Sequence, residues 1–176
     1  VGNGAKVLIE RSLKGVMPEN FNEIVDFYNE SYNFCGSPKT CVYDGMTELL
    51  KELKKEGYLL AVVSNKPQDG TTEVIRKFFG DGLFDYVYGQ REGVKTKPDK
   101  EPVEIVLKAL NVLKKDAVYV GDSEVDALTA INADLYGISV LWGFREKSLL
   151  VETGAVNFAE NASELHEIIE NHFKNR

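Results

Sequence analysis

Two aspartates that follow an expected buried strand are the clearest candidates for chemistry in this sequence. Asp122 comes directly after the mostly apolar residues 117–121, and Asp126 lies four residues later, one turn into an expected helix. Both carboxylates can therefore face the crevice beyond the end of the strand. Paired oxygen ligands at such a place suit Mg2+, which takes one or two carboxylates together with water and phosphate oxygens.

The same segment also fits a purely structural role. Ser123 and Asp126 match a capping box, in which both side chains satisfy the N-terminus of the following helix. As a local pattern the cap is favoured by roughly two to one, because this spacing is common. Asp122 is not needed for a cap, so it carries the case for a metal site.

A second expected strand, residues 58–63, ends in polar residues that could hold phosphate. The hydroxyl of Ser64 and the adjacent backbone N–H groups could bind a phosphoryl oxygen, although a plain polar turn is the better interpretation of this segment alone. Lys97, which precedes Pro98, is either a solvated loop lysine or a fixed cation aimed at the same crevice.

Other nucleophiles are poorly supported. The sequence has no Gly-x-Ser-x-Gly motif around Ser64, and its two histidines, His166 and His172, are six residues apart near the C-terminus. We expect both to be exposed on a surface helix and to lie on different faces of it. Cys35 and Cys41 are interpreted as free thiols.

Composition limits the partners of this chain. Its 176 residues carry 21 Lys and Arg against 28 Asp and Glu, a formal charge of −7, which argues against nucleic-acid binding. The longest wholly apolar run, residues 58–63, is too short to cross a bilayer, and no signal segment opens the chain. We therefore expect a cytoplasmic protein with neither nucleic acid nor membrane as a partner.

The elements that must position these residues change in kind near Ser37. Residues 5–14 and 21–34 have helical apolar spacing and form an expected hairpin over residues 1–36. Residues 37–176 then alternate between strand and helix, which predicts a doubly wound α/β core with a parallel sheet. Helices are expected over residues 47–56, 72–79, 102–113, 124–133 and 163–173, and strands over 58–63, 84–88, 117–120, 137–142 and 155–158.

Three segments taken in order resemble the haloacid dehalogenase (HAD) superfamily of phosphotransferases. They are Ser64-Asn65-Lys66-Pro67, Lys97-Pro98 and Gly121-Asp122-Ser123-x-x-Asp126. Further segments look like the phosphoglycolate-phosphatase branch: Val1-Gly2-Asn3-Gly4, Leu8-Ile9-x-Arg11, Tyr43-Asp44-Gly45, Phe84-Asp85 and residues 139–145. The resemblance implies a Rossmann-like core with a helical cap, of which residues 1–36 would form part.

The resemblance also implies a role for each candidate residue. Ser64 and Asn65 would bind the phosphoryl group, and Lys97 would offset charge on the nucleophile and on the phosphoryl group. Asp122 would be an Mg2+ ligand, and Asp126 a second ligand or a group that orients the metal's water. The implied substrate is a small phosphorylated metabolite.

One part of the family pattern is absent from these residues. The family's nucleophile is the first aspartate of an Asp-x-Asp-Gly-Thr motif after an N-terminal strand, and this sequence contains no such motif. In the family that strand lies between those leading to Ser64 and Asp122, and its loss would expose two backbone edges. We therefore expect the first central strand and half of the cap to be missing, with the nucleophilic aspartate upstream.

Two functional hypotheses follow, from different classes. The first is an Mg2+-dependent phosphate monoester hydrolase that acts through an aspartyl-phosphate, and the second is a catalytically inactive phosphate- or metal-binding module. A receiver-like signalling domain is a weaker third, because the Ser-Asn-Lys-Pro turn and the helical hairpin argue against it. Substrate contacts could come from Gly2, Asn3, Gly4 and Arg11, although an arginine on a helix is more often simply solvated. Phosphoglycolate is suggested by the resemblance alone.

Overall fold

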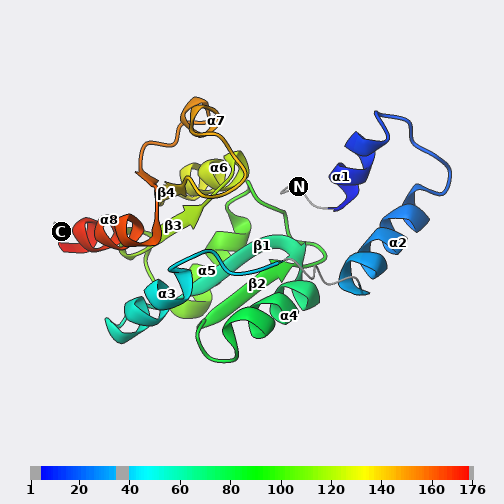
Figure 1. Cartoon of the computed structure of the whole chain (residues 1–176). Helices are drawn as coiled ribbons and strands as arrows, with labels where there is room; N and C mark the ends of the chain where they lie inside the picture. Colours follow the sequence, from blue (N-terminus) through cyan, green and yellow to red (C-terminus); the bar gives the residue numbers. More distant parts are fainter. Residues whose placement is uncertain (1–4, 35–39, 175–176) are drawn as a thin grey trace. The chain divides into compact units, whose positions relative to one another are not determined.

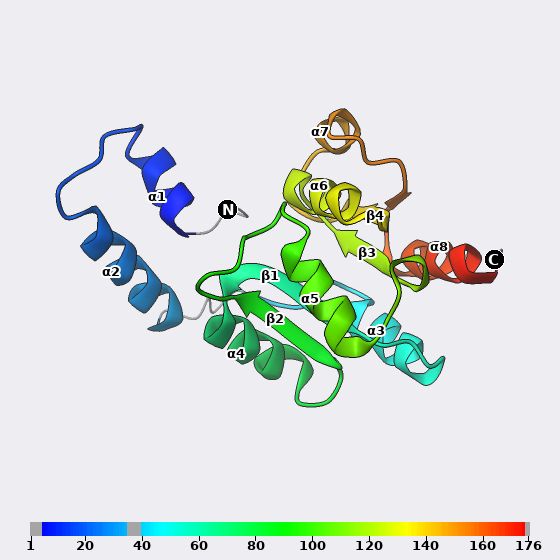
Figure 2. The same cartoon turned by 180° about the vertical axis from the view of Figure 1, so that it is seen from behind.

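A computed structural model of the chain describes residues 5–34 and 40–174. It contains two compact units, Val1–Cys41 and Val42–Arg176 (Figures 1 and 2). The boundary expected at Ser37 falls outside the described residues. None of the described helices is both long enough and apolar enough to cross a membrane.

The first unit is the expected helical hairpin. Helix α1 (Ala5–Ser12) packs on α2 (Phe21–Phe34), and each buries one aliphatic side chain, Ile9 and Val25 respectively. The bounds of α2 agree with the prediction. Helix α1 ends two residues early, because Lys14 and Gly15 adopt positive φ angles of 52° and 81°.

The second unit is an α/β fold with parallel strands only, as predicted. Strands β1 (Ala61–Pro67) and β2 (Tyr86–Gln90) form one sheet, and β3 (Val118–Gly121), β4 (Tyr136–Val140) and β5 (Phe158–Ala159) form another. The helices are α3 (Met46–Lys55), α4 (Gln68–Phe79), α5 (Glu101–Leu110), α6 (Glu124–Ala133), α7 (Lys147–Glu152) and α8 (Ala162–Lys174), with a 3-10 turn at Lys114–Asp116. Helix α4 packs on β1 and β2, α6 packs on β3 and β4, and α5 contacts β1, β2 and α6.

The two sheets are not joined by strand pairing. In the part of the chain that the structure describes, β1 pairs with β2 and β3 pairs with β4, so β1 and β3 each end a sheet. This strand order agrees with the expectation that a strand between them is missing from the sequence. The two halves nevertheless share one apolar core, which contains Leu53, Leu60 and Ile138.

Helices α3 and α8 run side by side in the same direction. Their first residues meet, since a Cβ atom on Gly45 would lie 3.1 Å from that of Ala162. Their later residues meet through His166, which contacts Glu56 just after α3. The shared core contains Leu49 and Leu53 of α3 together with Leu165 and Ile169 of α8. The last helix of the unit therefore packs against its first helix.

Several expected boundaries were wrong. Helix α3 begins after Gly45, whose φ of 75° ends the preceding turn, and Thr47 does not cap it. Strand β1 begins at Ala61 rather than Tyr58. The Leu60 N–H donates to the side chain of Asp85 instead of to a strand, although the Leu60 carbonyl oxygen accepts from the N–H groups of Asp85 and Tyr86. The short helix α7 and the 3-10 turn were not anticipated.

Candidate active site at the ends of β1 and β3

Asn65, near the end of β1, fixes the backbone of Lys97. Its side-chain amide donates to the carbonyl oxygen of Lys97 at 3.0 Å and accepts from the Lys97 N–H at 2.8 Å. Asn65 is only 7% exposed. Both ends of the amide are therefore used inside the protein, which supports a role in holding Lys97 rather than in binding phosphate.

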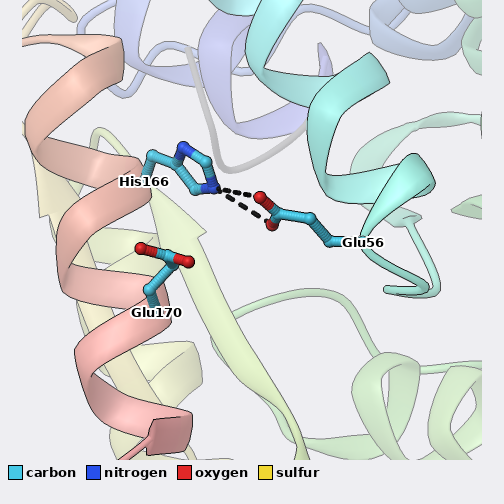
Figure 3. A group of neighbouring side chains, drawn as sticks. All are labelled: Glu56, His166 and Glu170. Atoms are coloured by element: carbon cyan, nitrogen blue, oxygen red, sulfur yellow. Dashed lines mark hydrogen bonds and ion pairs between the residues drawn. The ribbon is translucent and has the colours of Figure 1, made fainter.

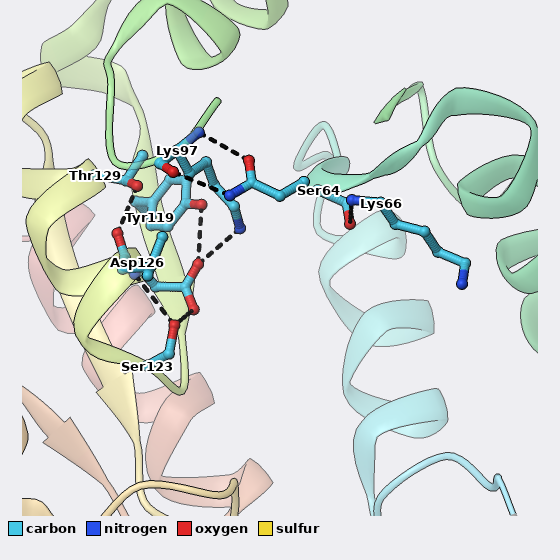
Figure 4. Close-up of polar contacts among 9 residues, drawn as sticks. Ser64, Lys66, Lys97, Tyr119, Ser123, Asp126 and Thr129 are labelled. Carbon is cyan, nitrogen blue, oxygen red and sulfur yellow. Dashed lines mark hydrogen bonds and ion pairs between the residues drawn. The ribbon is translucent and has the colours of Figure 1, made fainter. Parts of the chain in front are cut away.

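The side chain of Lys97 reaches from this point to α6. Its Nζ lies 2.8 Å from Oδ1 of Asp126, and the two side chains are 12% and 13% exposed (Figure 4). Asn132, also on α6, donates to the carbonyl oxygen of Pro98 at 2.8 Å and holds the same loop. A buried cation is thus placed where the two sheets have no strand pairing.

Asp126 receives three side-chain donors. Oδ1 accepts from Lys97 and from the hydroxyl of Tyr119 at 3.2 Å, while Oδ2 accepts from the hydroxyl of Ser123. Ser123 is also the N-cap of α6, where its oxygen accepts from the Asp126 N–H. The Ser123 half of the expected capping box is therefore present, whereas the Asp126 carboxylate bonds to side chains and is the counter-ion of the buried lysine.

The charges of this group are mutually stabilised. Burial alone would favour neutral forms, but Tyr119 and Asp126 outweigh it and raise the pKa of Lys97. Burial likewise opposes ionisation of Asp126, but Lys97 and the hydroxyls of Ser123 and Tyr119 hold its pKa below the ordinary value. Burial raises the pKa of Tyr119 to about 12, so at neutral pH the site holds an ammonium, a carboxylate and an un-ionised phenol.

Tyr119 was missed at the sequence level. It lies two residues before Gly121 on β3, so both residues are on the same face of the strand. Any Cβ atom on Gly121 would lie 2.2 Å from that of Asp126. A tyrosine and a glycine alternating in an otherwise apolar strand were the signal that this face meets a polar side chain.

Asp122 lies just beyond β3 and is held by the loop after β4. Its Oδ2 accepts from the Phe144 N–H at 3.3 Å, and a Cβ atom on Gly143 would lie 2.3 Å from its Cβ and its Oδ2. The same loop is attached to α6 by Arg145, which donates to both oxygens of Glu124 at 2.6 and 3.1 Å. Close backbone approach therefore sets the position of Asp122.

Ser64 keeps its hydrogen-bond donor available for a ligand. Its oxygen accepts from the Lys66 N–H at 3.1 Å, a turn within the end of β1. No acceptor for the Ser64 hydroxyl hydrogen occurs among the residues that the structure describes. This leaves the O–H free to donate to an anionic oxygen.

These observations test whether Mg2+ fits. Asp122 has one carboxylate oxygen without a hydrogen-bond partner in residues 5–34 and 40–174. Both oxygens of Asp126 already accept hydrogen bonds, and Lys97 neutralises its charge. One free carboxylate suits Mg2+, which retains most of its waters, and the geometry favours Asp126 as a group that orients water or Lys97.

The remaining candidate residues belong to the first unit, Val1–Cys41. Gly2, Asn3 and Gly4 are outside the described residues. Arg11 is exposed on α1, in the first unit. These four positions stay predictions.

The expectation that both histidines are solvent-exposed was wrong. His166 is half-buried and pairs with Glu56, 110 residues away in the sequence. His172 is also half-buried and stacks on Tyr136 with the ring centroids 3.8 Å apart. The C-terminal helix is packed on both sides because α3 and β4 supply partners that a local pattern does not show.

Comparison with known proteins agrees with this geometry. A family model described as haloacid dehalogenase-like hydrolase matches residues 2–140. A phosphoglycolate phosphatase from Colwellia psychrerythraea is 32% identical over 151 residues, which cover 82% of this chain and 67% of that protein. The chain thus spans about two thirds of the length of such curated relatives.

Solved structures show the same fold. A crystal structure from Lactobacillus delbrueckii subsp. bulgaricus has a TM-score of 0.90 at 30% identity, covering 96% of this chain and 80% of the other. One from Clostridium acetobutylicum has a TM-score of 0.86 at 27% identity, with coverages of 97% and 79%.

Proposed function

Because this chain belongs to the haloacid dehalogenase-like hydrolase family, we propose that it forms most of an Mg2+-dependent phosphatase for small phosphate monoesters. The observation that carries the proposal is the buried Lys97–Asp126 pair, held through Asn65. Asn65 directly follows Ser64 at the end of β1, and Asp122 directly follows β3. Phosphoryl transfer requires mainly positioning and charge stabilisation, and these residues supply both.

Each residue has one part in this proposal. Ser64 donates to a phosphoryl oxygen, and the Lys97 ammonium offsets the negative charge that gathers on the attacking and transferred groups. Asn65 and Asp126 position Lys97 from either side. Asp122 holds Mg2+, which when bound supplies positive charge to the phosphoryl oxygens.

The nucleophile comes from residues outside this sequence. An aspartate carboxylate attacks phosphorus, and the bond to the alcohol oxygen breaks as that oxygen takes up a proton and leaves as the alcohol. Water then hydrolyses the aspartyl-phosphate to inorganic phosphate and the free carboxylate. The unpaired positions of β1 and β3 next to Ser64 and Asp122 support this assignment. A cytoplasmic location and phosphoglycolate as substrate belong to the same proposal, the second supported by the names of the relatives.

Phosphate release from a panel of monoesters, phosphoglycolate included, tests the proposal with and without Mg2+. The assay compares this chain with a longer chain that carries the residues encoded immediately upstream. We expect release only from the longer chain, only with Mg2+, and much slower release after Lys97→Ala. Lys100→Ala is the matched control, because Lys100 is an exposed lysine of the same loop that pairs with Glu104.

Two outcomes would contradict the proposal. A folded longer chain that binds Mg2+ and phosphate without turnover would instead support a catalytically silent binding module. Turnover that Lys97→Ala and Lys100→Ala reduce equally would remove the role given to Lys97.

A further inference from the structure

A second group of potential ligands lies away from the candidate active site, between the end of α3 and α8. It consists of Glu56, His166 and Glu170, which converge from the two helices (Figure 3). Nothing in the proposed phosphatase chemistry uses these residues.

The geometry of the group is set by the parallel packing of the two helices. His166 Nε2 lies 3.0 Å from both carboxylate oxygens of Glu56. His166 and Glu170 are one turn apart on α8, so their side chains share a face of that helix. One donor atom from each of the three residues lies within 4.8 Å of the other two.

The electrostatics of the place favour a cation. The charged neighbour of Glu170 is Lys174, whose Nζ lies 2.9 Å from a Glu170 oxygen. Glu56 and Glu170 thus place two carboxylates beside one imidazole, and among the described residues Lys174 is the cation paired with Glu170.

We propose that Glu56, His166 and Glu170 bind a divalent transition-metal ion of the Zn2+ class. One imidazole nitrogen and two carboxylates form a donor set that Zn2+ and Ni2+ accept, whereas Mg2+ prefers oxygen alone. Tetrahedral ligands at about 2.1 Å from the metal are about 3.4 Å from one another. The His166–Glu56 pair, at 3.0 Å, must therefore open by about 0.4 Å, and donor atoms that lie up to 4.8 Å apart must approach by at most about 1.4 Å. Bound metal would replace Lys174 at Glu170 and fasten α8 to α3.

The test uses the whole chain in excess Mg2+, so that oxygen-only sites are occupied, and titrates Ni2+ and Zn2+ by calorimetry and thermal unfolding. We expect saturable binding of one ion and a rise in the unfolding temperature, since a ligand that binds only the folded state stabilises it. His166→Gln and Glu170→Gln should each weaken binding by about tenfold or more. Glu167→Gln, an exposed acidic position on the same helix, should leave it unchanged.

Lys174→Gln should change the metal affinity in the opposite direction to His166→Gln and Glu170→Gln. Removing the ammonium that occupies Glu170 should strengthen metal binding several-fold, whereas a site elsewhere would not respond. Circular dichroism confirms that each variant is folded. If a variant is unfolded, the proton NMR signals of the unsubstituted chain decide, because it has only two histidines. Paramagnetic Ni2+ should then shift and broaden His166 far more than His172.

Three results would overturn the proposal. They are binding that His166→Gln leaves intact, an imidazole of His166 unaffected by Ni2+, and no saturable binding in the presence of Mg2+. None of these depends on phosphatase activity, so failure of this site and failure of the proposed function are separate outcomes.

Discussion

The side-chain amide of Asn65 holds both polar groups of the Lys97 backbone, donating to its carbonyl oxygen and accepting from its N–H. The ammonium of the same lysine is bound by Asp126 on α6. A residue of the first sheet and a residue next to the second therefore meet through one lysine. The position of that charge depends on both halves of the fold.

Asn65→Ala should lower the free energy of unfolding by about 2 to 3 kcal/mol, because two hydrogen bonds are lost and two backbone groups are left without partners. Urea denaturation measures the change. Asn65→Asp still accepts from the Lys97 N–H, but it places a buried carboxylate oxygen against the Lys97 carbonyl oxygen, so we expect a loss at least as large. A loss below about 0.5 kcal/mol for Asn65→Ala would show that the two bonds contribute little.

Lys97→Met should destabilise the fold by about 3 kcal/mol, because it leaves the Asp126 carboxylate buried without its counter-ion. Lys100→Met is the control: that lysine pairs with Glu104 while 53% exposed, and its loss should cost no more than about 0.5 kcal/mol. Adding Asp126→Asn to Lys97→Met removes the unpaired charge and should recover part of the loss. Equal effects of the two lysine substitutions in urea unfolding would contradict a buried ion pair.

Gly143→Ala should weaken Mg2+ binding about tenfold or more without removing a ligand. The added methyl group would overlap Asp122, since its carbon would lie 2.3 Å from Oδ2. Calorimetric titration of the chain with Mg2+ measures the effect. Phe144→Ala is the matched control, because the Phe144 side chain is 86% exposed and only its backbone N–H contacts Asp122. Identical titrations of both variants and the unsubstituted chain would remove Asp122 from the metal site.

Asp85 should make the free energy of unfolding fall as the pH is lowered through the acidic range. Burial opposes its ionisation, but Lys54 and the Leu60 N–H outweigh burial and hold the pKa of Asp85 below its ordinary value of 3.8. A lowered folded-state pKa means that the stabilisation is present above the ordinary value and is lost as the pH falls through the folded-state value. Asp85→Asn should therefore cost about 1 to 2 kcal/mol at neutral pH and progressively less below about pH 4.

Urea unfolding of both proteins at several pH values measures this difference. Asp81→Asn is the control, since Asp81 is 83% exposed in its pair with Arg76, and we expect a change within about 0.5 kcal/mol at every pH. A cost for Asp85→Asn that stays constant down to about pH 2 would contradict the prediction.

Local signals in the sequence predicted some elements closely and missed others for identifiable reasons. Helix α6 has the predicted bounds because Ser123 provides an N-cap that needs no distant partner. The start of β1 was placed three residues early, because Leu60 is apolar and buried but bonds to the side chain of Asp85. Apolar character alone does not distinguish a paired strand from a buried segment that leads into one.

Some residues of the candidate site could likewise be predicted from the sequence, and others could not. Lys97 and Asp122 could be named as candidates because both follow expected strands, whose ends meet at one edge of a parallel sheet. The role of Asn65 could not, since it depends on a contact with a residue 32 positions away. The pairing of Glu56 with His166 joins residues 110 positions apart, and no local pattern in either helix indicates it.

The parallel packing of α3 and α8 also suggests that the second unit would tolerate circular permutation of its sequence. Its first and last helices lie together, with Gly45 next to Ala162, so the ends of this unit are separated by little more than one helix. Helix α8 has 13 residues, a length of about 20 Å at 1.5 Å per residue. A linker of about ten residues from Lys174 to Val42 would span that distance. A short linker would therefore join the two ends of the unit. New termini in an exposed turn such as residues 91–93 would then give a circularly permuted chain with the same core.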